Sequence, residues 1–280
     1  MTNQKIDFVK MTGSGNDFVL IDNRRGVIDA NQAAAWAAQV CRRGLGIGAD
    51  GLILLHDDPD PEFDFTWRFF NSDGSEAEMC GNGGRCAVRF AYDHGLAASK
   101  EMAFRTLVGK VRGWILDGKD IRVGLTEPQD YRPKVMVSVP AGEIRLSYID
   151  TGVPHAVWLV RDVEAADVLR LGRQIREHEE FAPRGTNVNF VQVTGPDSLS
   201  IRTYERGVEA ETLACGTGCA AAAITMGLVG RVRPPVMIRT RSGDVLCVDY
   251  TQENDKITNL TFQGPVRYVA RGVLDPESWE

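Results

Sequence analysis

The feature that most constrains the fold of this 280-residue chain is an internal repeat. The sequence Cys-Gly-Asn-Gly at 80–83 has a counterpart, Cys-Gly-Thr-Gly, at 215–218. Each stands ahead of an apolar, alanine-bearing run that is typical of a helix. Two more pairs match in the same order: 106–111 with 240–245, and 15–21 with 152–160. Because the offsets all lie between 134 and 137 residues, we expect two halves with similar structures.

Each half of the repeat reads as strands, a glycine-rich turn, a short apolar helix and then further strands. Hairpins are expected over 114–123 and over 245–262, the second turning at Asn254 and Asp255. Helix-forming composition predicts further helices at 31–41 and 163–179. A helix that is apolar on every side is best buried by a strongly curved sheet. We therefore predict an α+β fold with two pseudo-symmetric lobes, each a β-barrel-like curved sheet around a central helix.

Prolines suggest where the lobes divide, since they cluster and hydrophobic periodicity lapses between residues 128 and 140. The expected N-terminal lobe covers residues 1–127 and the C-terminal lobe covers 128–264. A final strand within 265–280 is expected to return to the first lobe.

Composition excludes several kinds of partner. A net charge of −6 and a pI near 5.4, with no basic run, argue against nucleic acid. The N-terminus lacks the apolar region of a signal peptide, which predicts a cytoplasmic protein. Residues 212–230 carry no charge, yet their glycines leave only about 219–226 as good helix. A membrane span needs roughly 20 apolar residues, so a buried core helix is the better interpretation and no membrane is expected.

Six cysteines in an intracellular chain of this length do not suggest a disulfide framework. Cys215 and Cys219 stand one helical turn apart, but the chain has no Cys-x-x-Cys pair and no nearby histidine. Structural zinc is therefore a weak alternative, and no metal is expected. Four of the cysteines are expected to be small core residues: Cys41, Cys86, Cys219 and Cys247.

Cys80 and Cys215 point to proton transfer. A thiol at a helix N-terminus has its thiolate favoured by the unpaired N–H groups and the helix dipole. Packed about an approximate two-fold axis, two such thiols would address opposite faces of one substrate carbon, as stereocentre inversion requires. The adjacent glycines predict backbone nests for a carboxylate. Neither loop has a nucleotide-binding pattern.

Three other segments have both a structural and a functional interpretation. Residues 71–75 are typical of a turn, although Asn71 could also hold a polar ligand. Glu205 and Arg206 could be a solvated pair, or a clamp for an amino group and a carboxylate. Their neighbours Glu209 and Glu211 are expected to be surface charges. His155 could be a structural histidine or a functional one.

Taken together, these motifs resemble the diaminopimelate epimerase family over nearly the whole chain. The matching segments are 11–18, 46–51, 70–76, 80–86, 154–155, 186–190, 204–207 and 214–218. The cysteine pair alone is shared with a wider superfamily that includes proline racemases. The Asn-Asp-Phe segment at 16–18 and the Tyr-Glu-Arg-Gly segment at 204–207 are more specific to the epimerases.

The resemblance implies epimerisation of LL-2,6-diaminopimelate to the meso form without a cofactor, in lysine and peptidoglycan-precursor biosynthesis. Cys80 and Cys215 would be the acid and base, with His155 and Glu205 adjusting their pKa values. Substrate contacts would come from Asn16, Asn71, Gly81, Asn82, Asn187, Glu205, Arg206, Gly216 and Thr217. Some family members have Gln at Gly51 and Asn at Val153, and those two contacts are not carried over.

Two alternatives remain at this point. One is another isomerase on the same scaffold, such as a proline racemase or an allylic isomerase. Against it, a small cyclic substrate has no distal zwitterion for Glu205 and Arg206 to hold. The other is a redox or metal-binding module that uses its cysteines structurally. The sequence does not fix the oligomeric state, and a homodimer is left open.

Overall fold

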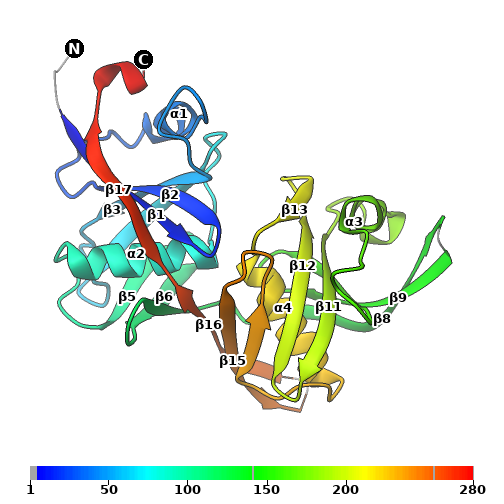
Figure 1. Cartoon of the computed structure of the whole chain (residues 1–280). Helices are drawn as coiled ribbons and strands as arrows, with labels where there is room; N and C mark the ends of the chain where they lie inside the picture. The colour runs from blue at the N-terminus through cyan, green and yellow to red at the C-terminus, as the bar shows by residue number, and fades with distance from the viewer. Residues whose placement is uncertain (1–4, 141, 255, 280) are drawn as a thin grey trace. The chain divides into compact units, whose positions relative to one another are not determined.

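The computed structural model describes residues 5–140, 142–254 and 256–279 (Figure 1). Its strands greatly outnumber its helices, which confirms the α+β class. The chain forms two compact units. Unit 1 contains the described residues up to Val123 and those from Gly264 onward, and unit 2 is Gly124–Gln263. The chain thus crosses between units after residues 123 and 263, whereas the sequence suggested crossings after 127 and 264.

Unit 1 is a run of strands in which parallel and antiparallel pairs alternate at first. Its elements are β1 (Ile6–Gly13), β2 (Asn16–Asp22), α1 (Ala33–Val40), β3 (Gly51–His56), β4 (Phe65–Asn71), α2 (Gly81–Asp93), β5 (Glu101–Thr106), β6 (Gly109–Ile115), β7 (Asp120–Gly124) and β17 (Arg267–Leu274). β1 pairs antiparallel with both β17 and β2. β2 is parallel to β3, β3 antiparallel to β4, and β4 parallel to β5. β5, β6 and β7 then pair antiparallel in succession.

Unit 2 repeats this topology. Its elements are β8 (Gln129–Val139), β9 (Gly142–Asp150), β10 (Pro154–Leu159), α3 (Val168–Arg176), β11 (Asn187–Gly195), β12 (Ser198–Glu205), β13 (Ala210–Thr212), α4 (Gly216–Leu228), β14 (Val236–Arg239), β15 (Val245–Glu253) and β16 (Lys256–Pro265). β9 is antiparallel to β10, β10 parallel to β11, β11 antiparallel to β12, and β12 parallel to β14. β14, β15 and β16 again pair antiparallel. The repeat read from the sequence is therefore a repeat of strand pairing.

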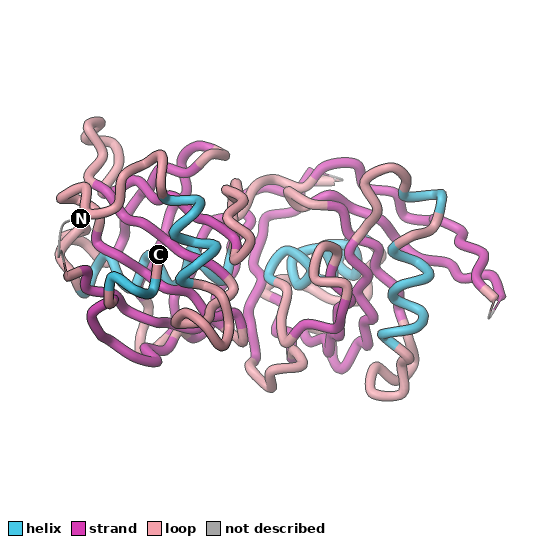
Figure 2. Tube along the Cα trace, turned by 90° about the horizontal axis from the view of Figure 1, so that it is seen from above, coloured by secondary structure: helices cyan, strands magenta, loops and turns pink. Residues whose placement is uncertain are grey.

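One helix in each unit is largely buried among the strands (Figures 1 and 2). α2 packs against β1, β2, β3 and β6, and α4 packs against β9 to β12, β14 and β15. Ten of the thirteen residues are buried in each of these helices. This confirms the predicted curved sheet around a central helix. Among the described residues, no helix is long and apolar enough to cross a membrane.

The helices differ in length from the sequence expectation. α4 extends over Gly216–Leu228 rather than 219–226, so glycines fall inside it. A side chain at Gly216 would run into the ring of Phe262, and one at Gly227 into Tyr250. Close packing against the sheet therefore outweighs the weak helix propensity of glycine. α3 begins only at Val168 because the Asp167 side chain caps it, accepting from the Arg170 N–H at 3.3 Å.

The two expected hairpins are present. β6 pairs with β7, and β15 pairs with β16. Within the second turn, Asn254 adopts a positive φ of 55°, and Asp255 lies outside the described residues.

Candidate active site

Cys80 begins the central helix of unit 1. It is the N-cap residue of α2, with extended backbone angles, and its Sγ accepts a hydrogen bond from the Gly83 N–H at 3.4 Å. The Cys80 carbonyl accepts from the Gly84 N–H at 2.7 Å and so starts the helical ladder. Its side chain is half-buried. A backbone N–H aimed at sulfur is the kind of contact that stabilises a thiolate.

Asn16 and Asn82, both predicted site residues, are joined directly. Asn82 Nδ2 donates to Asn16 Oδ1 at 2.6 Å, and Asn16 Nδ2 donates to Asp50 Oδ2 at 2.9 Å. On its other side, Asn82 Oδ1 accepts from Nη2 of the fully buried Arg85 at 3.0 Å. The same Nη2 donates to Ser14 Oγ at 3.0 Å. The first turn of α2 is therefore anchored to the β1–β2 hairpin.

Asp50 belongs to a charged cluster at the start of β3. Its carboxylate accepts from the Asp17 backbone N–H at 3.1 Å, and Arg43 bridges both carboxylates. Lys10 lies 2.9 Å from Asp17. Burial alone would raise the pKa of Asp17, but the bonds from Arg43 and Lys10 hold that pKa below its usual value. These ionic contacts keep the strand ends around Asn16 in place.

Asn71 lies at the end of β4 in the turn that its sequence predicted. Its carbonyl accepts from the Gly74 N–H at 2.9 Å, and its Nδ2 donates to Ser75 Oγ at 3.0 Å. Gly51 is opposite Asn71 in the β3–β4 pair. A side chain at Gly51 would collide with the ring of Phe69. The Gln found there in some family members therefore has no room in this chain as packed.

Cys215 begins the central helix of unit 2, in the same N-cap position. It is only 7% exposed, and its Sγ lies 3.5 Å from Thr217 Oγ1. Burial, and next the negative charge of Glu205, raise the pKa of this thiol well above its usual value. Contacts from Thr217 and the backbone of Gly218 act in the opposite direction. The helix N-terminus was expected to favour the thiolate, but at Cys215 burial outweighs it.

The predicted clamp residues of unit 2 gather around Asn187. Its Oδ1 accepts from the Arg206 backbone N–H at 2.9 Å, and its Nδ2 donates to the Pro154 carbonyl at 3.1 Å. Arg206 Nη1 donates to the Arg184 carbonyl at 3.0 Å. Glu205 Oε2 accepts from Thr212 Oγ1 at 2.8 Å. Glu205 and Arg206 thus have separate partners within the fold.

Glu211 is not the surface charge that the sequence suggested. Both of its carboxylate oxygens accept from Arg202, at 2.7 and 2.8 Å. The two side chains are only 17% and 12% exposed. This bidentate pair holds β12 to β13 beside Glu205.

His155 is fully buried on β10, where it lies opposite Asn187 of β11. Its Nδ1 is 3.1 Å from Asn189 Nδ2. Burial, helped by the charge of Arg206, lowers the pKa of His155 to about 3, so the ring is neutral near pH 7. Asn189 and Asp50 had no role in the sequence-based site, although both fall in its quoted motifs. The available signal was the Asn-x-Asn pattern at 187–189, which places two amides on one face of a buried strand.

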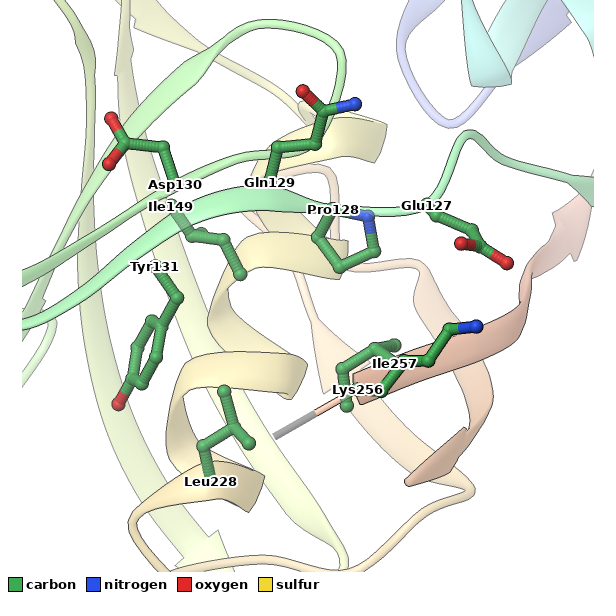
Figure 3. A pocket seen from close by; sticks show the side chains of 9 residues that line it. All are labelled: Glu127, Pro128, Gln129, Asp130, Tyr131, Ile149, Leu228, Lys256 and Ile257. Carbon is green, nitrogen blue, oxygen red and sulfur yellow. The ribbon is translucent and has the colours of Figure 1, made fainter. Parts of the chain in front are cut away.

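A pocket in unit 2 is separate from Cys215. It is lined by residues 127–131, which lead into and begin β8, by Ile149, by Leu228, and by two residues of β16 (Figure 3). Leu228 ends α4 whereas Cys215 precedes it, and at 1.5 Å per residue that helix separates them by roughly 20 Å. Within the described part of the chain, no three His, Cys, Asp or Glu side chains are grouped to hold a metal ion.

Comparison with solved structures identifies proteins that share this fold. A probable proline racemase from Agrobacterium radiobacter K84 aligns with a TM-score of 0.73 and 16% identity, covering 98% of this chain and 95% of its own. A Bacillus anthracis protein of the PhzF phenazine biosynthesis family aligns with a TM-score of 0.75 and 13% identity, covering 97% and 99%. At such low identity these likenesses show the fold alone. The sequence relatives described next are epimerases, and they place the chain among the isomerases.

Sequence comparison then narrows the class. The diaminopimelate epimerase family model matches residues 8–129 and 147–269. The diaminopimelate epimerase of Aquifex aeolicus (strain VF5) is 47% identical, covering 98% of this chain and all of its own. That of Hydrogenobaculum sp. (strain Y04AAS1) is 43% identical, with coverage of 96% and 98%. The chain belongs to the diaminopimelate epimerase family.

Proposed function

We propose that this protein interconverts LL- and meso-2,6-diaminopimelate without a cofactor, passing protons through Cys80 and Cys215. The observation that carries the proposal is the equivalence of the two thiols. Each is the N-cap of the buried helix of its unit, in a chain of the diaminopimelate epimerase family. The reaction would serve lysine and peptidoglycan-precursor biosynthesis.

The two thiols differ in environment, which supports different resting roles. The raised pKa of Cys215 keeps it protonated near pH 7, so it would start as the acid. Cys80 receives the Gly83 N–H and would start as the thiolate base. Cys80 would remove the α-proton while Cys215 delivers its own proton to the opposite face of the carbon. After this step Cys80 is the thiol and Cys215 the thiolate, the pair that the reverse reaction uses. Proton exchange with solvent would restore the starting states before the next forward turnover.

The substrate's reacting carboxylate would bind at the helix starts. The first N–H groups of a helix have no acceptor within it, and they favour an anion. These groups belong to Gly81 and Asn82 in α2, and to Gly216 and Thr217 in α4. Concentrated donors there would stabilise the negative charge that develops when the α-proton leaves.

The distal amino-acid end of the substrate would contact side chains already fixed by the fold. Arg206 offers a guanidinium fork for a carboxylate, and Glu205 offers an acceptor for an ammonium group. Three side-chain amides would make the remaining contacts: Asn16 and Asn71 of unit 1, and Asn187 of unit 2. His155 and Glu205 would shift the pKa values of the thiols. For Glu205 this is supported by its negative charge, which raises the pKa of Cys215.

The remaining expectations concern setting and assembly. The partner is a small molecule, and a net charge of −6 supports no nucleic-acid role. We infer a cytoplasmic location, and we keep the homodimer as a proposal that sedimentation equilibrium would decide.

The proposed function is tested with purified protein that has been dialysed exhaustively against a chelator. Incubation with LL-diaminopimelate, followed by chiral chromatography, should give the meso isomer, while L-proline should stay unracemised. No conversion by correctly folded protein would contradict the proposal. Activity that requires an added metal would overturn its cofactor-independent part.

A further inference from the structure

The strand pairings allow the two units to be compared position by position, in the strands that pack against α2 and α4. Phe18 is opposite Gly51 in the parallel β2–β3 pair, just as His155 is opposite Asn187 in β10–β11. Two residues further along, Ile53 corresponds to Asn189. Ile53 faces Phe69 across β3–β4, whereas Asn189 faces Thr203 across β11–β12. Three positions that are apolar in unit 1 are thus polar in unit 2.

Ile53 and Asn189 also lie against equivalent helix positions, the third residues of α2 and α4. A side chain added at Gly83, the third residue of α2, would touch Ile53 Cδ1 at 3.3 Å. The corresponding residue of α4 is Gly218, whose added side chain would run into Asn189 Oδ1. In unit 2 a fully buried amide therefore supports the turn that carries Cys215.

The hydrogen bonds of Asn189 determine which way its amide points. Its Nδ2 lies 3.0 Å from the carbonyl oxygen of Ala156, which can only accept. The nitrogen must therefore face Ala156, and Oδ1 faces Thr203, whose hydroxyl donates to it at 3.0 Å. The reversed amide would place two acceptors against each other.

This orientation determines the protonation of His155. The same Nδ2 lies 3.1 Å from His155 Nδ1 and has a second hydrogen to donate there. Nδ1 is then an acceptor, and a neutral ring carries its proton on Nε2. Nε2 is buried, and none of the described residues forms a hydrogen bond with it. His155 Nε2–H is therefore a buried donor with no acceptor among the described residues, and it is available to an added group.

We propose that Asn189 is a positioning residue that locks His155 in the Nε2–H tautomer, so that the site offers a fixed donor to an anionic acceptor. This inference deepens the proposed function and rests on it for the identity of the acceptor, a carboxylate or a thiolate. Unit 1 has the apolar residues Phe18, Ile53 and Phe69 at the same positions. Its strands therefore offer no equivalent side-chain donor at these three positions. Asn189 itself would not touch the substrate.

The tautomer is measured directly by long-range ¹H–¹⁵N NMR on the full-length protein with ¹⁵N-labelled histidine. The chain has four histidines, and single His56→Gln, His94→Gln and His178→Gln variants would assign the other three. Wild-type His155 should show a protonated Nε2 and a bare Nδ1 across neutral pH. A protonated Nδ1, or an imidazolium at pH 7, would overturn the proposal without any substitution at the site.

Variants then connect the tautomer with activity. Asn189→Asp presents an acceptor to Nδ1, so the proton should move to Nδ1 and epimerase kcat should fall by roughly 100-fold or more. Thr203→Val leaves the bond to Ala156 in place and should keep the Nε2–H pattern with a much smaller loss. Thr194→Val, at an exposed position of β11, the strand that carries Asn189, is the matched control. An unchanged tautomer in Asn189→Asp, or a moved proton with full activity, would contradict the proposal.

The NMR result is independent of the substrate. A chain that shows the Nε2–H pattern but never epimerises diaminopimelate would overturn the proposed function while supporting the tautomer assignment. A chain that epimerises diaminopimelate with a protonated Nδ1 would do the reverse.

Discussion

Asn82 donates a hydrogen bond of 2.6 Å from its Nδ2 to Oδ1 of Asn16, joining the second residue of α2 to the first residue of β2. Asn82 is only 2% exposed, and its Oδ1 is held in turn by Arg85. The proposed carboxylate nest of unit 1 is thus fixed through side chains before any ligand arrives. Such preorganisation reduces the cost of ordering the site during the reaction.

Asn82→Ala should therefore damage both binding and stability. Removing its amide takes one hydrogen bond from the half-buried Asn16 and one from the buried Arg85, which keeps its bond to Ser14. Loss of such bonds typically costs about 1–3 kcal/mol. We expect the free energy of unfolding in urea to fall by that amount and kcat/KM to fall by roughly 10- to 100-fold. Asn31→Ala, at an exposed position, is the control and should change neither quantity. A kcat/KM equal to wild type would contradict the proposed nest.

The cysteines should react with iodoacetamide in a defined order. At pH 7.5 the half-buried Cys80 should be alkylated well before Cys215, because burial and a raised pKa keep Cys215 as the thiol. Burial also raises the pKa of Cys41 and Cys86 to about 12, so both should be spared. Peptide mass spectrometry would follow each site, with urea-unfolded protein as the reference in which all react. Faster alkylation of Cys215 than of Cys80 would contradict the assigned resting states.

Acid should destabilise the protein partly through His155. The unfolded chain binds a proton on this histidine below about pH 6.5, whereas the folded protein does so only near pH 3. Stability from this group is therefore complete above pH 6.5 and declines as the pH falls. Between pH 7 and 4.5, wild type should lose about 2–3 kcal/mol more unfolding free energy than His155→Gln. Equal losses in urea titrations would show that His155 does not bind its proton as expected.

The two equivalent helix glycines should respond differently to alanine. In Gly83→Ala the only tight contact of the added carbon is with the end of the Ile53 side chain, at 3.3 Å, so the variant should be neutral or stabilised by up to about 1 kcal/mol. Gly218→Ala runs into the Asn189 amide, which hydrogen bonds hold in place, and should destabilise by about 1–3 kcal/mol. Urea unfolding of both variants would measure the difference. Similar effects would mean that Asn189 is free to move.

The sequence predicted the elements that a repeat can reveal. The Cys-Gly-x-Gly motifs at 80–83 and 215–218 located both N-caps. The runs that follow them located both central helices. The length of α4 was underestimated because propensity counts glycine against a helix. Propensity takes no account of the close approach of Phe262 and Tyr250.

Side-chain chemistry was harder to predict than position. The pKa of Cys215 depends on its burial and on Glu205, ten residues earlier in the chain, and a helix-dipole argument includes neither. Asn189 had no assigned role in the sequence analysis. Its role depends on Ala156 and Thr203, which reach it only through strand pairing.

The central claim is that two different thiols move the proton, and solvent isotope labelling tests it most directly. LL-diaminopimelate is incubated in deuterium oxide with wild type, Cys80→Ala or Cys215→Ala, and deuterium is located early in the reaction by mass spectrometry of the separated isomers. If one thiol removes the proton and the other delivers a deuteron from solvent, wild type should place deuterium at the α-carbon of the meso product. The recovered substrate should stay unlabelled. Both variants should lose epimerisation by several orders of magnitude. Label appearing equally in substrate and product, or near-full activity in either variant, would contradict the account.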